Sequence, residues 1–271
     1  MTWQLLVSQG RVADRSTALL EGSAQISEML QSSFDLTAQV VGCYEVNECV
    51  SDDWQHSLQH ASPHLTLLSQ AVEQVLLANN TVLAVHSTCA TSLASLPQAV
   101  KHFPEIKLLR LDAHADFNTP QTTGSGHLSG MVLAELCGRW QGTSSYHLDT
   151  KNVMLVGVRE LDDAEGKLLA QSQIASIQQI DIEKILTFIG ASPVWIHIDW
   201  DVLDQGYLPD YNIKGGLTPS ELAQLLQCIP KHQLKGIELA EYYAAMDSEQ
   251  KIQDLQMIES VVRGVLEHKA E

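Results

Sequence analysis

The chain has 271 residues, a formal net charge of −17 at pH 7 and 45% hydrophobic residues. This length and composition suffice for the buried core of one α/β domain. The acidic balance argues against nucleic acids and anionic membranes as partners and favours small cationic molecules. Residues 1–15 lack the apolar segment of a signal peptide, no apolar run reaches membrane-spanning length, and the five cysteines lack metal-finger spacing. We therefore expect a cytoplasmic protein.

Apolar segments of strand length alternate along the chain with longer segments of helical periodicity. The predicted strands are Trp3–Val7, Ala38–Cys43, Thr81–Val85, Ile106–Leu111, Val153–Val158, Val194–Ile198 and Gly236–Leu239. The predicted helices are Ser16–Phe34, Leu65–Ala78, Leu128–Cys137, Ala164–Ala170, Ile182–Ile189, Pro219–Cys228 and Ser248–Leu266. Such alternation is typical of a mostly parallel sheet with helices on both faces, a three-layer α/β/α fold. No linker or repeat divides the chain, so we expect a single domain over residues 1–271.

Two of the predicted strands, 106–111 and 194–198, are each followed directly by a group of polar residues. The groups are Asp112, His114 and Asp116 after the first strand, and Asp199 and Asp201 after the second. Alternate side chains of an extended segment point the same way, and open parallel sheets bind ligands at the carboxyl ends of their strands. Clustered carboxylates repel one another unless a cation neutralises them, and oxygen ligands with one imidazole suit Mn²⁺. Either group alone is typical of a solvated acidic loop, but the two together predict a metal site.

The longest motif spans residues 112–130 and reads D-A-H-A-D-F-N-T-P-Q-T-T-G-S-G-H-L-S-G. It resembles the arginase branch of the ureohydrolase family. Shorter strings at 198–204, 215–218 and 238–241, which read I-D-W-D-V-L-D, G-G-L-T and E-L-A-E, are similar to further motifs of that family. The resemblance implies an arginase-like α/β/α fold and two Mn²⁺ ions that activate water for attack on a guanidinium carbon.

The resemblance also implies a role for each matching residue. By position, the metal ligands are Asp112 and Asp199, shared by both ions, with Asp116 at the first ion and His114 and Asp201 at the second. The implied substrate contacts are Asn118 and Ser125 for the α-carboxylate, Asp162 for the α-amino group and Glu241 for the guanidinium. The implied partner is therefore a small guanidino amino acid, cationic or neutral. A homo-oligomer is also compatible with the family.

The first departure from the family lies at its first metal motif, G-G-D-H-S, which follows a strand. Here the predicted strand 81–85 leads into H-S-T-C-A, and the best register places Cys89 at the position of the ligand histidine. A shift of three residues would offer His86 instead. A thiol is a softer and weaker partner than imidazole for Mn²⁺, so we expect the Cys89 site to bind its ion more weakly than the second site.

The second departure concerns proton transfer. Arginases carry a histidine where this chain has Ser129, and His127 replaces an asparagine. A serine hydroxyl neither releases nor takes up a proton near neutral pH, so other groups must protonate the departing amine. The candidate catalytic residues are therefore Asp116, Glu241 and His127.

Both departures, together with residues 7–15 and 195–203, resemble the branch of the family that hydrolyses Nω-hydroxy-L-arginine to hydroxyurea and L-ornithine. A hydroxyguanidine is less basic than a guanidine, so its neutral form demands less Lewis acidity and less proton shuttling. One alternative is an arginase, which converts L-arginine to urea and L-ornithine, or a relative acting on agmatine; Asn118 and Asp162 favour an amino acid over agmatine. The other alternative is a metal-deficient homologue with a binding or regulatory role.

Overall fold

The computed structural model describes residues 2–43, 53–208 and 213–267. Its centre is one eight-stranded sheet, in which every neighbouring pair of strands is parallel. The strands are β1 (Trp3–Ser8), β2 (Ala38–Val41), β3 (Thr81–Val85), β4 (Lys107–Leu111), β5 (Val153–Val156), β6 (Ala175–Ile177), β7 (Val194–Asp199) and β8 (Leu234–Ala240). Their order across the sheet is β2-β1-β3-β8-β7-β4-β5-β6.

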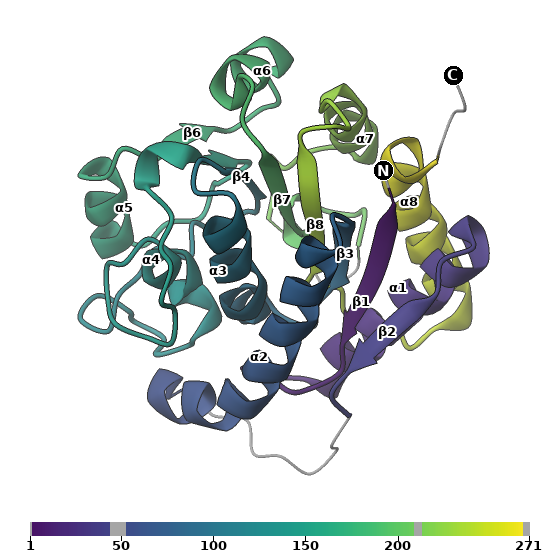
Figure 1. The fold of residues 1–271 in the computed structure, drawn as a ribbon, viewed down its shortest axis with the longest axis horizontal. Helices are drawn as coiled ribbons and strands as arrows, with labels where there is room; N and C mark the ends of the chain where they lie inside the picture. The colour runs from purple at the N-terminus through teal and green to yellow at the C-terminus, as the bar shows by residue number, and fades with distance from the viewer. Residues whose placement is uncertain (1, 44–52, 209–212, 268–271) are drawn as a thin grey trace.

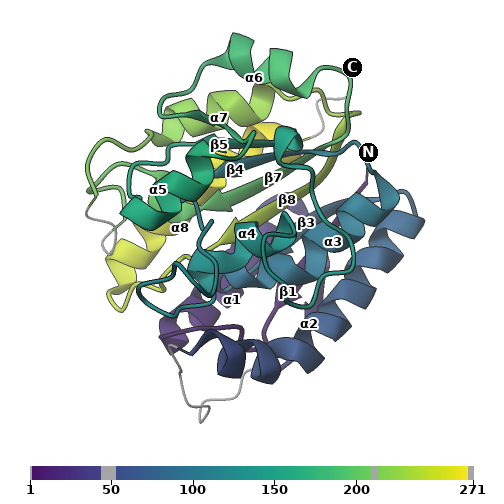
Figure 2. The same ribbon diagram turned by 90° about the vertical axis from the view of Figure 1, so that its left-hand side faces the viewer.

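Helices cover both faces of this sheet (Figures 1 and 2). They are α1 (Thr17–Phe34), α2 (Trp54–Leu77), α3 (Ser92–His102), α4 (Val132–Leu136), α5 (Asp163–Ala170), α6 (Ile182–Ile189), α7 (Pro219–Cys228) and α8 (Ser248–Leu266). Buried side chains of α1, α6, α7 and α8 form the core on one face, and those of α2, α3 and α4 form it on the other. The predicted three-layer α/β/α fold is thereby confirmed. Among the described residues, no helix has the length and apolar character needed to cross a membrane.

Several element boundaries differ from the sequence prediction. The strand β6 and the helix α3 were not predicted; β6 has only three residues and α3 contains Pro97, so both give weak local signals. Helix α2 begins at Trp54 rather than Leu65, although Pro63 lies inside it. The predicted helix 128–137 is divided into a 3₁₀ turn, Ser129–Met131, and the short α4.

The register of the four central strands brings their carboxyl ends to one edge of the sheet. Leu111 of β4 is paired with Ile198 of β7, and Ile198 is paired with Leu239 of β8. Leu239 is in turn paired with Val85 of β3. The chain segments that follow these four residues therefore lie side by side, although they are far apart in the sequence.

Candidate active site

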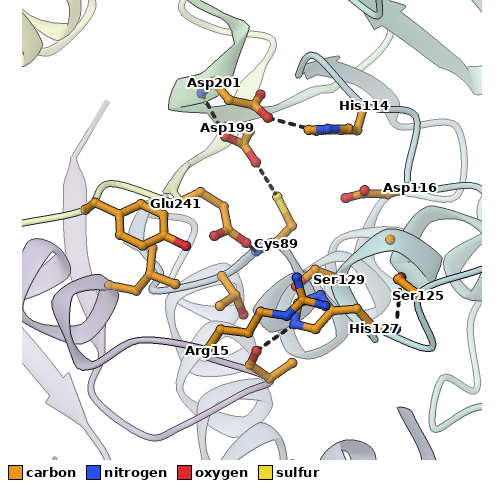
Figure 3. A pocket seen from close by; sticks show the side chains of 15 residues that line it. Arg15, Cys89, His114, Asp116, Ser125, His127, Ser129, Asp199, Asp201 and Glu241 are labelled. Atoms are coloured by element: carbon orange, nitrogen blue, oxygen red, sulfur yellow. Dashed lines mark hydrogen bonds and ion pairs between the residues drawn. The ribbon is translucent and has the colours of Figure 1, made fainter. Parts of the chain in front are cut away.

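A cavity of about 300 Å³ lies at this edge of the sheet (Figure 3). The predicted site residues that line it are Cys89, His114, Asp116, Ser125, His127, Asp199, Asp201 and Glu241. An adjoining cavity of about 510 Å³ shares His114, Asp116 and Ser125 with the first, and also contains Asn118 and Asp162. Asp112 is fully buried beside them. The structure thus brings all the predicted site residues together at one end of the sheet.

On one side of the cluster, His114 lies between two carboxylates. Its Nδ1 is 2.8 Å from Oδ2 of Asp201 and 3.6 Å from Oδ1 of Asp112. Backbone N–H groups hold both carboxylates: His114 N donates to Asp112 Oδ1 (2.7 Å), and Ala113 N donates to Asp201 Oδ1 (2.9 Å). Hydrogen bonds to Asp112 and Asp201 raise the pKa of His114 well above its usual value.

This side fits a divalent cation. One ligand atom each from Asp112, His114 and Asp201 lie within 4.8 Å of one another. Carboxylate oxygens with one imidazole nitrogen form a donor set suited to Mn²⁺. A bound cation would take over the electrostatic attraction that His114 exerts on both carboxylates.

On the other side of the cluster lies a cation that the sequence analysis did not identify, Arg110. Its Nη2 donates to Oδ2 of Asp112 at 2.7 Å and also forms an ion pair with Asp116. The Arg110 side chain is fully buried. The spacing held a signal for it, because Arg110 precedes Asp112 by two residues and so points to the same face of β4. Two of the three carboxylates expected at the first ion, Asp112 and Asp116, are therefore already paired with a guanidinium.

Cys89, rather than His86, lies at the cluster, as the favoured register predicted. Its Sγ is 3.1 Å from Oδ2 of Asp199 and 3.1 Å from Nε2 of His197. His86 does not line the cavity, and its Nε2 lies 3.5 Å from Glu238. Burial, together with the charge of Asp199, raises the pKa of the Cys89 thiol well above its ordinary value. A thiol that keeps its proton is a poor metal ligand.

Cys89 nevertheless belongs to two candidate groups of ligand atoms that lie within 4.8 Å of one another. One group joins it to Asp199 and Glu241, and the other joins it to Asp112 and His197. Asp116 belongs to neither group, although the sequence predicted it as a ligand of the first ion. The full ligand set expected for that ion is therefore not assembled.

A buried polar network lies behind Cys89. His197 Nδ1 is 2.7 Å from Oε2 of Glu238. The same oxygen accepts a hydrogen bond from Ser92 (2.7 Å), and Oε1 of Glu238 accepts one from Ser95. The sheet creates this network, because His197 of β7 is paired with Glu238 of β8. Burial and the nearby Arg110 guanidinium lower the pKa of His197, so that its imidazole is neutral. The sequence analysis missed both residues because they lie inside apolar strand segments.

Glu241 lies at the wall of the cavity, beside Cys89 and Asp199 (Figure 3). Its φ of 62° is in the left-handed region, which turns the chain sharply after β8. Its Oε1 accepts a hydrogen bond of 2.9 Å from the Cys89 backbone N–H. Burial raises the pKa of Glu241 well above its ordinary value. A cationic or hydrogen-bond-donating guest in the cavity would lower that pKa again.

The remaining predicted residues lie around the mouths of the two cavities. His127 Nε2 is 2.9 Å from the carbonyl oxygen of Ala13, and the His127 backbone N–H donates to Ser125 Oγ at 3.2 Å. In the adjoining cavity, Asn118 Nδ2 donates to Asp162 Oδ2 at 3.4 Å. These groups offer both donors and acceptors at a distance from the acidic cluster, as the polar end of an amino acid requires.

Comparison with known proteins identifies the family. The arginase family model matches residues 12–264, so the chain belongs to the arginase family. It is 37% identical over 261 residues to the N(omega)-hydroxy-L-arginine amidinohydrolase of Streptomyces lavendulae, and the alignment covers 95% of each protein. It is 27% identical over 207 residues to the arginase of Plasmodium berghei (strain Anka). That alignment covers 68% of this chain and 58% of the Plasmodium arginase. The solved arginase structure from Bacillus subtilis superimposes with a TM-score of 0.82 at 21% identity, covering 100% of both chains. That last likeness is one of fold.

Proposed function

We propose that this member of the arginase family is an amidinohydrolase that converts Nω-hydroxy-L-arginine and water to hydroxyurea and L-ornithine. The observation that carries this proposal is the 37% identity to the Streptomyces lavendulae hydroxyarginine enzyme, which extends over 95% of both proteins. The site supports it, because Cys89 and Ser129 both line the cavity where arginase-like chemistry requires imidazoles.

Asp112, His114 and Asp201 would hold the divalent cation, with Mn²⁺ as the proposed ion. When bound, such an ion supplies a Lewis acid that activates water beside the guanidine carbon. Glu241, which lines the same cavity, is placed to accept hydrogen bonds from the guanidine N–H groups and to orient that carbon. The net reaction joins the oxygen of water to the guanidine carbon and breaks the bond from that carbon to the ornithine nitrogen.

The departing ornithine nitrogen must receive a proton. Ser129 lines the cavity but cannot supply one near neutral pH. Glu241 has a raised pKa and faces the guanidine position, so we assign it this transfer, with Asp116 and His127 as the other titratable candidates. Asp162 is proposed to bind the α-amino group, and Asn118 and Ser125 the α-carboxylate, because these residues line the adjoining cavity.

L-Arginine is the second candidate substrate, since the similarity to arginases extends over two thirds of this chain. A metal-deficient binding protein is disfavoured, because Asp112, His114 and Asp201 keep a donor set suited to a divalent cation.

Parallel incubation of the Mn²⁺-loaded protein with both amino acids tests this proposal. We expect hydroxyurea and ornithine from hydroxyarginine, with a kcat/KM well above that for urea formation from arginine. An equal or greater kcat/KM on arginine would identify an arginase instead. No product from either amino acid, with metal bound, would refute the proposed reaction.

A further inference from the structure

The two oxygens of the Asp112 carboxylate face different cations. Oδ1 accepts the His114 backbone N–H and faces the His114 imidazole, on the side that fits a divalent ion. Oδ2 accepts a hydrogen bond of 2.7 Å from Arg110 Nη2. The carboxylate that the family resemblance predicts to be shared by two metal ions thus lies between one candidate ion site and one guanidinium.

Arg110 is held in this place by the sheet. It lies inside β4, paired with His197 on one side and with Leu155 on the other. Its side chain is fully buried, and within the described part of the chain it forms ion pairs with Asp112 and Asp116. A guanidinium keeps its charge even when buried, so these two carboxylates are its counter-charges.

A divalent ion bound at the first position would compete with Arg110 for these two carboxylates. It would weaken the pairing of the buried Arg110 guanidinium with these carboxylates and place a second positive centre beside it. An uncompensated buried charge is strongly destabilising, and a like charge at short range adds to the cost. His197, the neighbour of Arg110 on β7, carries no negative charge in either protonation state and so cannot replace these counter-charges.

We propose that the Arg110 guanidinium takes the place of the first ion, so that the chain binds one divalent cation, at Asp112, His114 and Asp201. The inference rests on the proposed function only in taking a divalent ion as its cofactor. It also deepens that function. One metal ion beside a fixed guanidinium supplies less Lewis acidity than two metal ions. This weaker activation suits the less basic hydroxyguanidine better than the guanidinium of arginine. In this arrangement Cys89 is not a metal ligand.

Manganese stoichiometry tests the inference without substrate. The full chain is stripped with chelator, and bound Mn²⁺ is measured by equilibrium dialysis and by electron paramagnetic resonance. We expect one Mn²⁺ per chain, with the spectrum of a magnetically isolated ion. Asp201→Asn should abolish binding, whereas Asp116→Asn should leave one ion bound, as should the exposed control Asp163→Asn. A second ion that is lost in Asp116→Asn, or an exchange-coupled spectrum in the wild type, would overturn the inference.

Arg110 variants provide the complementary test. Arg110→Lys keeps a cation and should still bind one Mn²⁺, whereas Arg110→Met combined with Cys89→His should admit a second ion and give a coupled spectrum. Circular dichroism shows whether each variant is folded. If the double variant does not fold, the comparison of wild type with Asp116→Asn decides: equal counts of one ion support the inference, and a second ion present only in the wild type overturns it.

The predicted metal count and the proposed reaction can be refuted independently of each other. One bound ion without hydrolysis of either amino acid would refute the proposed function and leave this inference standing. Hydroxyurea formation by a chain that binds two coupled ions would refute this inference and support the proposed function.

Discussion

The two sides of the acidic cluster use the same carboxylate in different ways. On the His114 side, three ligand atoms gather around a position that an exchangeable cation can enter from the cavity. On the Arg110 side, the cation is a side chain of the protein itself. The Arg110 guanidinium is buried and is paired with Asp112 and Asp116. Although burial opposes ionisation, Arg110 and His114 hold the pKa of Asp112 down at about 2.

In the proposed one-ion site, a guanidinium neutralises the carboxylates at the position where the family resemblance predicts a second metal ion. A guanidinium neutralises clustered carboxylates and fixes their orientation, but it does not polarise water as a metal ion does. Retention of Asp116 in a sequence motif is therefore not sufficient evidence that Asp116 binds a metal ion.

Removal of Asp112 should have the largest effect, because it belongs to both sides. We expect Asp112→Ala to lower kcat/KM by at least about 10³-fold, through loss of the ion and of the Arg110 pairing. Hydroxyurea formation, bound Mn²⁺ and the thermal midpoint should be measured together. The exposed Asp163→Ala serves as the control. Retention of metal and of activity in Asp112→Ala would contradict the assignment.

Glu241 belongs to neither side and should act on the substrate alone. Glu241→Gln keeps the oxygen that accepts the Cys89 N–H, so the fold and the Mn²⁺ content should be unchanged. Glutamine can neither carry the proton nor offer a negative charge to the guanidine, so kcat/KM should fall by about 10²-fold. Steady-state kinetics beside the exposed control Glu249→Gln measure this effect. Wild-type kinetics in Glu241→Gln would mean that the guanidine is bound elsewhere.

His127 and Ser129 mark the departure in proton transfer. The double change His127→Asn with Ser129→His should raise the arginine-to-hydroxyarginine ratio of kcat/KM about tenfold, because an imidazole can then carry the proton. The ratio is measured by quantifying urea and hydroxyurea in parallel assays. An unchanged ratio would place the specificity outside this pair of residues.

Substitution of Asp14 should change the stability of the protein rather than catalysis, in contrast to substitution of Asp112. Asp14 is buried and accepts the Val12 N–H at 2.6 Å, and burial raises its pKa from 3.8 to about 6. The native state therefore binds a proton more tightly than the unfolded state, and stability falls as the pH rises from 3.8 to about 6. Asp14→Asn should be more stable than the wild type by about 3 kcal/mol at pH 7, and the difference should vanish below about pH 4.

Chemical denaturation of both proteins at a series of pH values checks this prediction. A constant difference between pH 4 and pH 7 would show that the Asp14 carboxyl does not titrate in that window.

The sequence predicted those parts of the molecule that depend on local pattern. Buried apolar runs located β1, β3, β4, β5, β7 and β8, and the motif at 112–130 located the acidic cluster. Strand β6 was missed because three residues at the sheet edge carry little hydrophobic signal. Helix α3 was missed because its apolar face is interrupted by serines and Pro97, yet it packs against the sheet through Leu93 and Leu96.

Arg110, His197 and Glu238 could not be grouped from the sequence, because they are neighbours only through the order of strands. Arg110 is adjacent to His197 across β4 and β7, and His197 is adjacent to Glu238 across β7 and β8. Sequence spacing reports which face of a strand a residue occupies, but not which strand lies beside it.

The most direct measurement of the difference between the two sides is an anomalous-scattering map at the manganese edge from crystals grown with excess Mn²⁺. The account predicts one peak, coordinated by Asp112, His114 and Asp201, with the Arg110 guanidinium still paired with Asp116. Two peaks, with Arg110 turned away and Asp116 bound to the ion nearer Cys89, would contradict it.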